Sequence, residues 1–266
     1  MPSITNFYKR ILMKKFLMVL MIILFSAVTG FCGKFEDTLK KAEQGDAFAQ
    51  CLLGVKYYIG KEVPQDYKEA AKWQARSAEQ GYAEAQNFLG IYYFFGTGIP
   101  QDYKKSIKWH KKAADQGHAG AQYRMGWMIV QGIGVPQDYK EAAEWFTKSA
   151  DQGNADAQAF LAVLYQRGDG LPKDNQMAFD WCLKAAKQGH VASQTFLGIL
   201  YYNGAGVLQD YIQAYAWWNI AASQGNDAAK NRRDTTLKEM SPEQIAKAQE
   251  LSKQLYDKIY GKPKQE

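Results

Sequence analysis

The sequence predicts an all-α fold: a right-handed α/α superhelical solenoid of five 36-residue helix-turn-helix repeats with helical caps. Three residue patterns predict it, because the dipeptide Gln-Gly, a Trp and an Asp each recur at a constant step of 36 residues. Self-similarity at such a period is typical of stacked repeats, in which each unit buries its apolar face against the next. We expect the repeats at residues 45–80, 81–116, 117–152, 153–188 and 189–224.

Each repeat is predicted to hold two helices. In the second repeat, one face of the first helix carries Gln86, Leu89, Gly90 and Tyr93 at helical spacing. The sequence GTGIPQD then interrupts the helix with Gly and Pro. Its final Asp is expected to cap the second helix by accepting hydrogen bonds from free backbone N–H groups. A Gly in the left-handed conformation should end that helix.

The most regular residues are interpreted as scaffold. In the third repeat this assigns Asp138 to a helix cap and Trp145 to the core. Small residues also recur at fixed positions, which lets the helices approach closely beside the large Trp. One such series consists of Gly54, Gly90, Gly126, Ala162 and Gly198. Regular positions of this kind specify the stack and leave partner recognition to the variable positions.

The two ends of the chain differ from the repeats. Residues 1–30 combine a basic start with the apolar run FLMVLMIILFSAV, which predicts a cleavable signal peptide; Met13 is an alternative start. The alternative reading is a membrane anchor, but the run is shorter than the roughly 20 apolar residues that a spanning helix needs. Residues 31–44 are predicted to form an N-terminal capping helix. Residues 225–266 are predicted to form C-terminal capping helices and a tail, beginning the last helix at Ser241-Pro242.

Charge and motif content exclude several functions. The formal charge of +6 falls to +2 without the four Lys and Arg residues of the predicted signal, and no basic stripe indicates nucleic-acid binding. The sequence has no H-E-x-x-H, no clustered Cys and His, and no G-x-S-x-G or S-x-x-K motif. His118 and His190 follow a Gly at equivalent positions and are expected to start helices. We therefore predict no catalytic residue, no metal and no cofactor, and interpret Cys51 and Cys182 as small core residues.

The repeat units resemble a known family. Each reads A-x-A-Q-x-x-L-G-x-x-Y, then G-x-G-V-P-Q-D-Y, then A-x-x-W-x-x-x-A-A-x-Q-G. This pattern is similar to the Sel-one-like repeats, which are related to the tetratricopeptide repeats, and it covers about 180 residues. Local departures are Gly60-Lys61-Glu62 in place of G-x-G, Ala162 in place of Gly, Asn175 in place of Tyr, and Leu208 in place of Pro. Cys-rich relatives are linked to penicillin binding or hydrolysis, but this chain lacks their paired Cys.

By analogy with the tetratricopeptide groove, variable positions of the first helices should face a concave groove. The predicted groove residues are Asn87, Phe94, Tyr123, Trp127, Gln131, Gln166, Arg167 and Asn203. Trp127 stands out because the equivalent residues are Val55, Ile91, Val163 and Ile199. An aromatic anchor among polar neighbours suits a protein or peptide partner, or a cell-wall glycan. The alternative is that Trp127 fills a gap between first helices.

These observations favour an exported, non-enzymatic adaptor or regulatory protein that holds a protein or peptide in its groove. The expected location is periplasmic or secreted, in a bacterium, with no membrane insertion after signal cleavage. Two alternatives stay open at this point: a cell-envelope enzyme of β-lactam or peptidoglycan chemistry, and a structural scaffold that works through its convex face.

Overall fold

The computed structural model describes residues 35–261, so the predicted signal peptide at residues 1–30 lies outside the described residues. Within this range the chain forms α-helices and one short 3-10 helix, with no strand. The first helices of the repeats are α3 (Ala47–Ile59), α5 (Ala83–Phe95), α7 (Ala119–Gln131), α9 (Ala155–Arg167) and α11 (Val191–Asn203). The second helices are α4 (Tyr67–Glu79), α6 (Tyr103–Asp115), α8 (Tyr139–Asp151), α10 (Asn175–Lys187) and α12 (Tyr211–Ser223).

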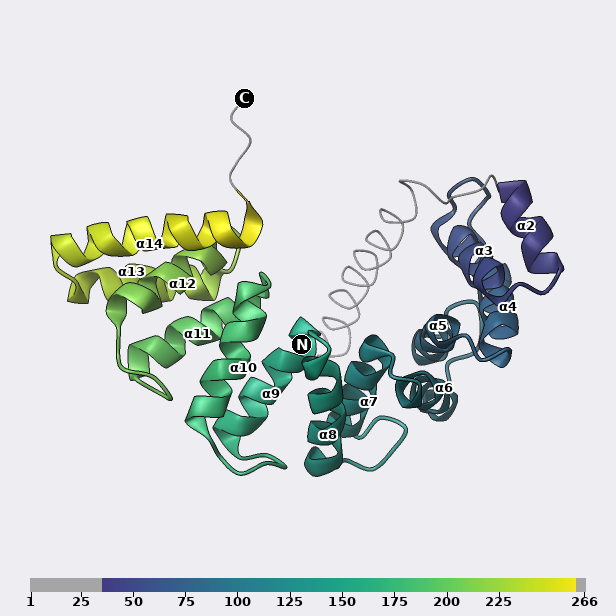
Figure 1. Cartoon of the computed structure of the whole chain (residues 1–266), viewed down its shortest axis with the longest axis horizontal. Helices are drawn as coiled ribbons and strands as arrows, with labels where there is room; N and C mark the ends of the chain where they lie inside the picture. The colour runs from purple at the N-terminus through teal and green to yellow at the C-terminus, as the bar shows by residue number, and fades with distance from the viewer. Residues whose placement is uncertain (1–34, 262–266) are drawn as a thin grey trace.

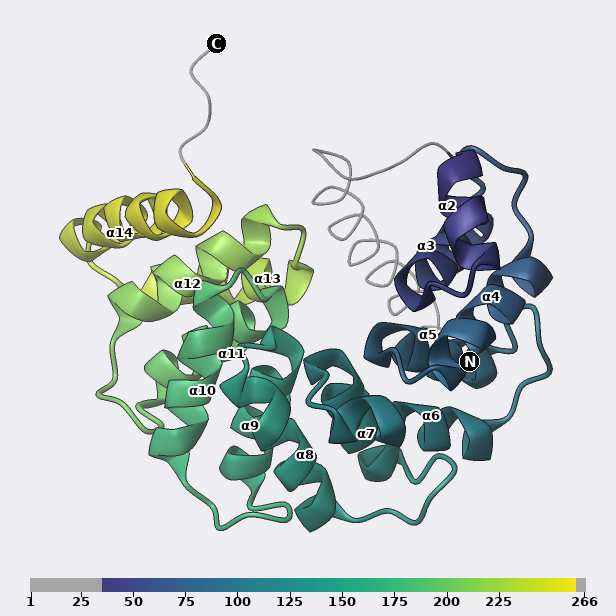
Figure 2. The same cartoon turned by 45° about the vertical axis from the view of Figure 1, so that its right-hand side comes forward.

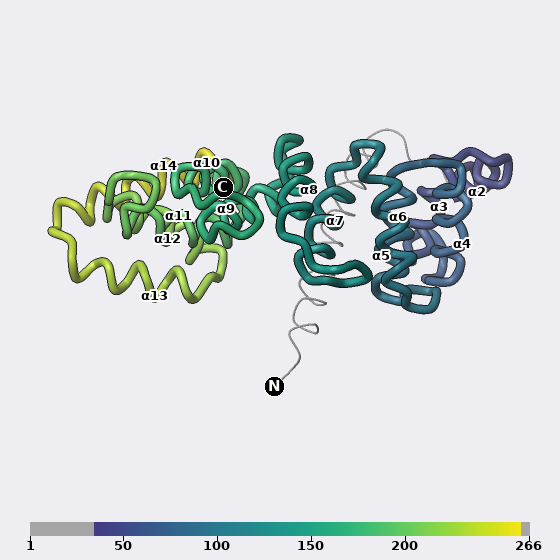
Figure 3. Tube along the Cα trace, turned by 90° about the horizontal axis from the view of Figure 1, so that it is seen from below, coloured from purple at the N-terminus to yellow at the C-terminus, as the bar shows by residue number. Residues whose placement is uncertain are grey.

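The helices stack in chain order along an open arc (Figures 1 and 2). Each helix contacts mainly the helix before it and the helix after it, as a solenoid requires. In Figure 1, α5 and α7 lie toward the inside of the arc, and α6 and α8 lie toward the outside. Seen from below, the early repeats and the late repeats form the two ends of the row (Figure 3). The predicted right-handed all-α solenoid is confirmed.

The caps follow the sequence prediction. The Asp66 carboxylate accepts from the backbone N–H groups of Lys68 and Glu69 at 2.8 and 3.1 Å, and Asp138 caps α8 in the same way. Gly81, with φ of +92°, follows the end of α4 in the left-handed conformation. His118 and His190 start α7 and α11 as expected, because each ring Nδ1 accepts from a backbone N–H of the first turn.

The second Gly of each G-x-G turn packs against the preceding repeat. A Cβ added at Gly98 would overlap the backbone carbonyl of Tyr67, at the start of the preceding second helix. Gly170 and Gly206 meet equivalent carbonyls. The first repeat has no complete repeat before it, and there Glu62 adopts the left-handed conformation with φ of +71°. The departure Gly60-Lys61-Glu62 therefore marks the start of the stack.

A ladder of glutamines joins successive repeats. The side-chain amide of Gln86 donates to the Ala78 carbonyl at 3.1 Å, and its oxygen accepts from Gln116 at 2.7 Å. Gln152 and Gln188 reach the Gln of the preceding first helix in the same way. At the C-terminal end the Tyr260 hydroxyl contacts the Gln194 side chain instead. A side chain of the terminal helix thus replaces the missing rung.

The ends of the stack are covered by helices of different length. Within the predicted cap at residues 31–44, α2 spans Phe35–Glu43. After the repeats come α13 (Asp227–Thr236), η1 (Leu237–Glu239) and α14 (Pro242–Tyr260), and α14 packs along α12. Ser241 and Gln244 form a complete capping box at the start of α14. Among residues 35–261 no helix has both the length and the apolar character needed to cross a bilayer.

Four of the five repeating Trp residues are buried in the core, as predicted, and Trp109 is half-buried against it. Trp145 is 8% exposed, and the Lys148 ammonium stands 4.3 Å from its ring centroid. The small residue of each first helix faces one side chain of the following second helix: Gly54 faces Gln74, Gly90 faces His110, Gly126 faces Phe146, and Gly198 faces Trp218. In the fourth repeat these positions hold Ala162 and Cys182. The added methyl of Ala162 thus occurs beside the small Cys182 side chain.

Candidate functional site

Two of the predicted groove residues come together. The rings of Phe94 and Trp127 meet edge to face with centroids 5.7 Å apart, although they belong to different repeats. Both side chains are half-buried. Trp127 therefore fills space between the two first helices and still presents part of its indole to solvent. The two interpretations of Trp127, as a binding anchor and as a residue that fills a gap between first helices, therefore apply to different parts of its side chain.

The other predicted residues are more scattered. Asn87 is only 7% exposed and offers a partner little surface. Tyr123 is half-buried and packs against both Phe146 and Phe160, with ring centroids about 6 Å away from each. The polar members outside the core are Gln131, Gln166, Arg167 and Asn203, of which only Gln166 is half-buried. The compact part of the site is therefore the pair Phe94 and Trp127.

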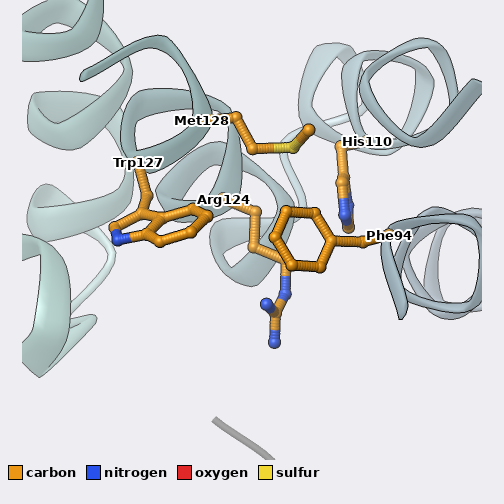
Figure 4. Close-up of a pocket in the computed structure, with 5 residues that line it drawn as sticks. All are labelled: Phe94, His110, Arg124, Trp127 and Met128. Atoms are coloured by element: carbon orange, nitrogen blue, oxygen red, sulfur yellow. The ribbon is translucent and has the colours of Figure 1, made fainter. Parts of the chain in front are cut away.

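A small pocket lies beside this pair, where the second and third repeats meet. It is lined by Phe94, His110, Arg124, Trp127 and Met128 (Figure 4). Its free volume of about 10 Å³ matches roughly one water molecule. Pockets that enclose a small-molecule ligand are typically about 300–1,000 Å³. The pocket therefore suits one protruding group of a larger partner.

His110 forms the inner wall of the pocket. Its side chain comes from α6, is 1% exposed, and fills the space above Gly90. Burial, the nearby Arg124 and, to a smaller extent, His118 hold the imidazole pKa well below its usual range. The ring is therefore neutral at pH 7. Its Nδ1 atom is buried and has no hydrogen-bond partner in the described part of the chain.

Arg124 is the charged residue of the pocket. Figure 4 shows its side chain running alongside the rings of Phe94 and Trp127, with the guanidinium beyond them. Burial lowers the Arg124 pKa, while Tyr123 and Asp156 act in the opposite direction. No hydrogen bond or ion pair joins its guanidinium to any residue in the range 35–261. Within that range the site thus presents a cation without an ion-pair partner beside two aromatic rings.

Sequence reasoning missed Arg124 and His110. The equivalents of Arg124 in the other repeats are Leu52, Phe88, Phe160 and Phe196, so a cation replaces an apolar residue only in the third repeat. The same comparison between repeats that singled out Trp127 was sufficient to find Arg124. His110 gives a weaker signal, because its equivalents Gln74, Phe146, Cys182 and Trp218 have nothing in common. Only the structure shows that this position faces the neighbouring repeat.

Two His–acid pairs flank the site. The Nε2 atom of His118 lies 2.7 Å from the Glu84 carboxylate, and that of His190 lies 3.3 Å from Asp156. In each pair Nδ1 accepts the helix-capping bond, which leaves Nε2 as the N–H that donates to the acid. These pairs link successive first helices. Both imidazoles therefore have structural roles, as helix caps and as links between first helices.

The remaining reactive groups are placed in the core. Cys51 and Cys182 are free and buried, and burial raises both thiol pKa values far above neutral pH. They behave as the small core residues that the sequence indicates. In the described residues no group of three or more His, Cys, Asp and Glu side chains is arranged to hold a metal ion.

Comparisons with known proteins agree with this architecture. Five Sel1 repeats match residues 47–82, 83–118, 119–154, 155–190 and 191–226. The solved structure of a Sel1 repeat protein from Oxalobacter formigenes is 34% identical, covers 79% of this chain and 86% of that chain, and has a TM-score of 0.69. The protective antigen c5321 of uropathogenic Escherichia coli, with an SLR fold, is 30% identical; the match covers 85% of this chain and 64% of that chain, with a TM-score of 0.48.

No curated protein matches the chain. The five matching units cover the region in which the repeats were predicted, and the structure there is a continuous stack of helix pairs. The resemblance to Sel-one-like repeats is confirmed, and the chain belongs to the Sel1 repeat family.

Proposed function

We propose that this protein is an exported, non-enzymatic adaptor that binds a protein or peptide partner in the groove formed by the first helices of its repeats. The observation that carries the proposal is the cluster of Phe94, Arg124 and Trp127 at the junction of the second and third repeats. Trp127 and Arg124 both replace residues that are aliphatic or aromatic in every other repeat. Trp and Arg are also the side chains most enriched at the energetic centres of protein interfaces.

Family membership supports the binding role. Sel1 repeat proteins generally mediate protein–protein interactions, and most are non-enzymatic repeat proteins. The small volume of the pocket favours a protruding side chain over an enclosed substrate. An enzyme of β-lactam or peptidoglycan chemistry, and the binding of a cell-wall glycan, gain no supporting observation among residues 35–261.

Export rests on the sequence of residues 1–30, which lie outside the described residues. The basic residues followed by a short apolar run and small residues support a cleavable signal, and hence a periplasmic or secreted protein of a bacterium. Fractionation of cells that produce the full chain, with N-terminal sequencing of the product, tests this part. Recovery of the uncleaved chain in the cytoplasm would contradict it.

Groove binding is tested by crosslinking in intact envelopes and quantifying captured proteins by mass spectrometry. We compare the wild type with Trp127→Val, because Val163 holds the equivalent position in the fourth repeat. A matched control is Leu208→Pro, which removes an apolar side chain that is 89% exposed outside the groove and restores the residue found in other repeats.

We expect Trp127→Val to lose at least one specific partner that Leu208→Pro retains. Circular dichroism melting of both variants confirms that each is folded before capture is compared. An identical set of crosslinked partners for wild type and Trp127→Val would contradict the assignment of this site.

A further inference from the structure

The charge of Arg124 is not neutralised by a direct ion pair in the described part of the protein. Its guanidinium makes no ion pair or hydrogen bond there, and its stem runs alongside Phe94 and Trp127 at the pocket. The equivalent residue at the next junction is Phe160, whose ring stacks on Phe146 with centroids 5.0 Å apart and planes 13° apart. An apolar ring therefore fits this backbone position well. A guanidinium placed here forgoes that packing and leaves a half-buried cation at the pocket.

The surroundings of Arg124 indicate which anion it fits. Asp156, on the neighbouring first helix, already exerts an electrostatic effect on the guanidinium. A single negative charge can pair with Arg124, whereas a phosphate dianion would be repelled more strongly by the Asp156 carboxylate. Recognition of phosphorylated segments also normally uses a cluster of Arg side chains, and the pocket contains one.

The apolar part of the site indicates what accompanies the anion. Phe94 and Trp127 are both half-buried, and their rings lie beside the Arg124 side chain. A charge-assisted hydrogen bond is strongest when neighbouring apolar groups exclude water from it. A segment with one carboxylate beside a large apolar residue would pair with Arg124 and cover both rings. A carboxylate at the C-terminus of a partner has no residue after it, so it would bring no apolar neighbour on that side.

We propose that Arg124 is the specificity residue of the groove and binds the carboxylate of an Asp or Glu side chain within a partner segment, next to an apolar residue that packs on Phe94 and Trp127. The inference rests on the proposed function, because it names the chemistry of the partner that the groove would hold.

The experiment selects binders from displayed random 12-residue segments that are flanked by linkers on both sides, so that every segment is internal. Targets are the wild type, Arg124→Phe, Trp127→Val and Arg232→Gln. Arg124→Phe installs the residue of three other repeats, so it preserves the fold. Arg232→Gln is the matched control, because it removes an equal charge from an exposed position on α13, which is not among the predicted groove residues.

We expect wild type and Arg232→Gln to enrich segments with one acid beside a large apolar residue, and Arg124→Phe to enrich apolar segments without the acid. For a synthetic segment with both termini blocked, Glu→Gln should weaken binding to wild type by about tenfold, as for a hydrogen bond to a charged group, and leave binding to Arg124→Phe unchanged. Restoring the free C-terminal carboxylate should change neither affinity.

Segments that bind wild type without an acidic preference, and equally well after Arg124→Phe, would overturn the carboxylate assignment while leaving groove binding intact. A preference for a free C-terminal carboxylate, or for phosphorylated segments, would also overturn it. If no segment is enriched on wild type over Trp127→Val, the proposed function fails together with the inference.

Discussion

Two junctions of the solenoid carry different kinds of side chain at the same two repeat positions. Where α8 meets α9, Phe146 is fully buried and stacks on Phe160, and Tyr123 packs against both rings. Where α6 meets α7, the equivalent positions hold His110 and Arg124. The first pair is a continuous apolar core. The second pair places a buried imidazole beside a guanidinium, and within residues 35–261 the imidazole Nδ1 has no hydrogen-bond partner and the guanidinium has no ion-pair partner.

The difference extends to the turns at these junctions. A Cβ added at Gly170 would overlap the Tyr139 carbonyl, whereas at Gly134 it would stand 2.8 Å from the Tyr103 carbonyl. The turn at the junction of the second and third repeats therefore leaves slightly more room, and the junction is more polar. Repeat proteins derive their stability from each unit and each interface between neighbours, so one interface can be weakened for function while the others hold the stack. Under the proposed function, binding and stability are assigned to different junctions.

The largest expected effect is at the apolar junction. Phe146→Ala should lower the free energy of unfolding by about 3–5 kcal/mol, because it empties a fully buried aromatic site. His110→Ala at the equivalent position should cost much less, since it also removes a buried polar nitrogen. Urea denaturation measures both, and hydrogen exchange in α8 and α9 localises the loss. Equal costs for the two substitutions would break the comparison.

The turns provide a second, smaller contrast. Gly134→Ala and Gly170→Ala both place Ala at positive φ, of +77° and +71°, which costs about 1–2 kcal/mol. Gly170→Ala should cost about 1 kcal/mol more, because the new Cβ meets a backbone carbonyl that cannot move aside. Thermal melting of the two variants is the measurement. If Gly134→Ala were the more damaging change, the extra room assigned to its turn would be wrong.

The third effect has the opposite sign. Arg124→Phe should raise the free energy of unfolding by about 1 kcal/mol, because it replaces a half-buried cation with the apolar residue of neighbouring repeats. Arg124→Lys, which keeps the charge, should give no such gain. Chemical denaturation of the two variants separates the effect of charge from that of packing. A loss of stability in Arg124→Phe would show that the guanidinium supports the fold.

The smallest effect is a pH dependence that arises at His110. Burial and Arg124 hold its folded-state pKa well below the value of about 6.5 for an unfolded chain, so the unfolded state binds more protons between the two values. Stability from this group is therefore complete above about pH 6.5 and falls as the pH drops toward the folded-state pKa. His110→Phe should flatten the dependence of the melting temperature on pH between 7 and 5.

His118 provides the control for that measurement. His118→Asn keeps the helix cap, because Asn154 caps α9 from the equivalent position with a bond of 2.9 Å to Ala157 N–H. It should leave the slope due to His110 in place. If His118→Asn removed the slope instead, the pH dependence would belong to the capping pair with Glu84.

Most of the fold could be predicted because the same sequence pattern occurs in all five repeats. The Asp caps, the buried Trp series and the left-handed Gly residues each depend on local chemistry that a periodic sequence makes visible. The role of Glu62 could not be predicted, since it depends on the absence of a preceding repeat rather than on any local signal.

The site was predicted less completely. Trp127 and Phe94 were identified, because Trp127 departs from an otherwise aliphatic position. Asn87 is buried, and Tyr123 belongs in part to the core, because superhelical curvature decides which face of each first helix is exposed. His110 comes from a second helix, which groove analogy does not consider. Its meeting with Arg124 depends on packing between repeats, and a single-repeat pattern does not contain that information.

The most direct test of the central claim is one double variant, Arg124→Phe with Trp127→Val, in which both residues become those of other repeats. Its unfolding free energy and its affinity for the segments selected on wild type are measured together. We predict stability equal to or above that of wild type, with binding lost. Reduced stability with binding retained would contradict the division between a binding junction and a packing junction.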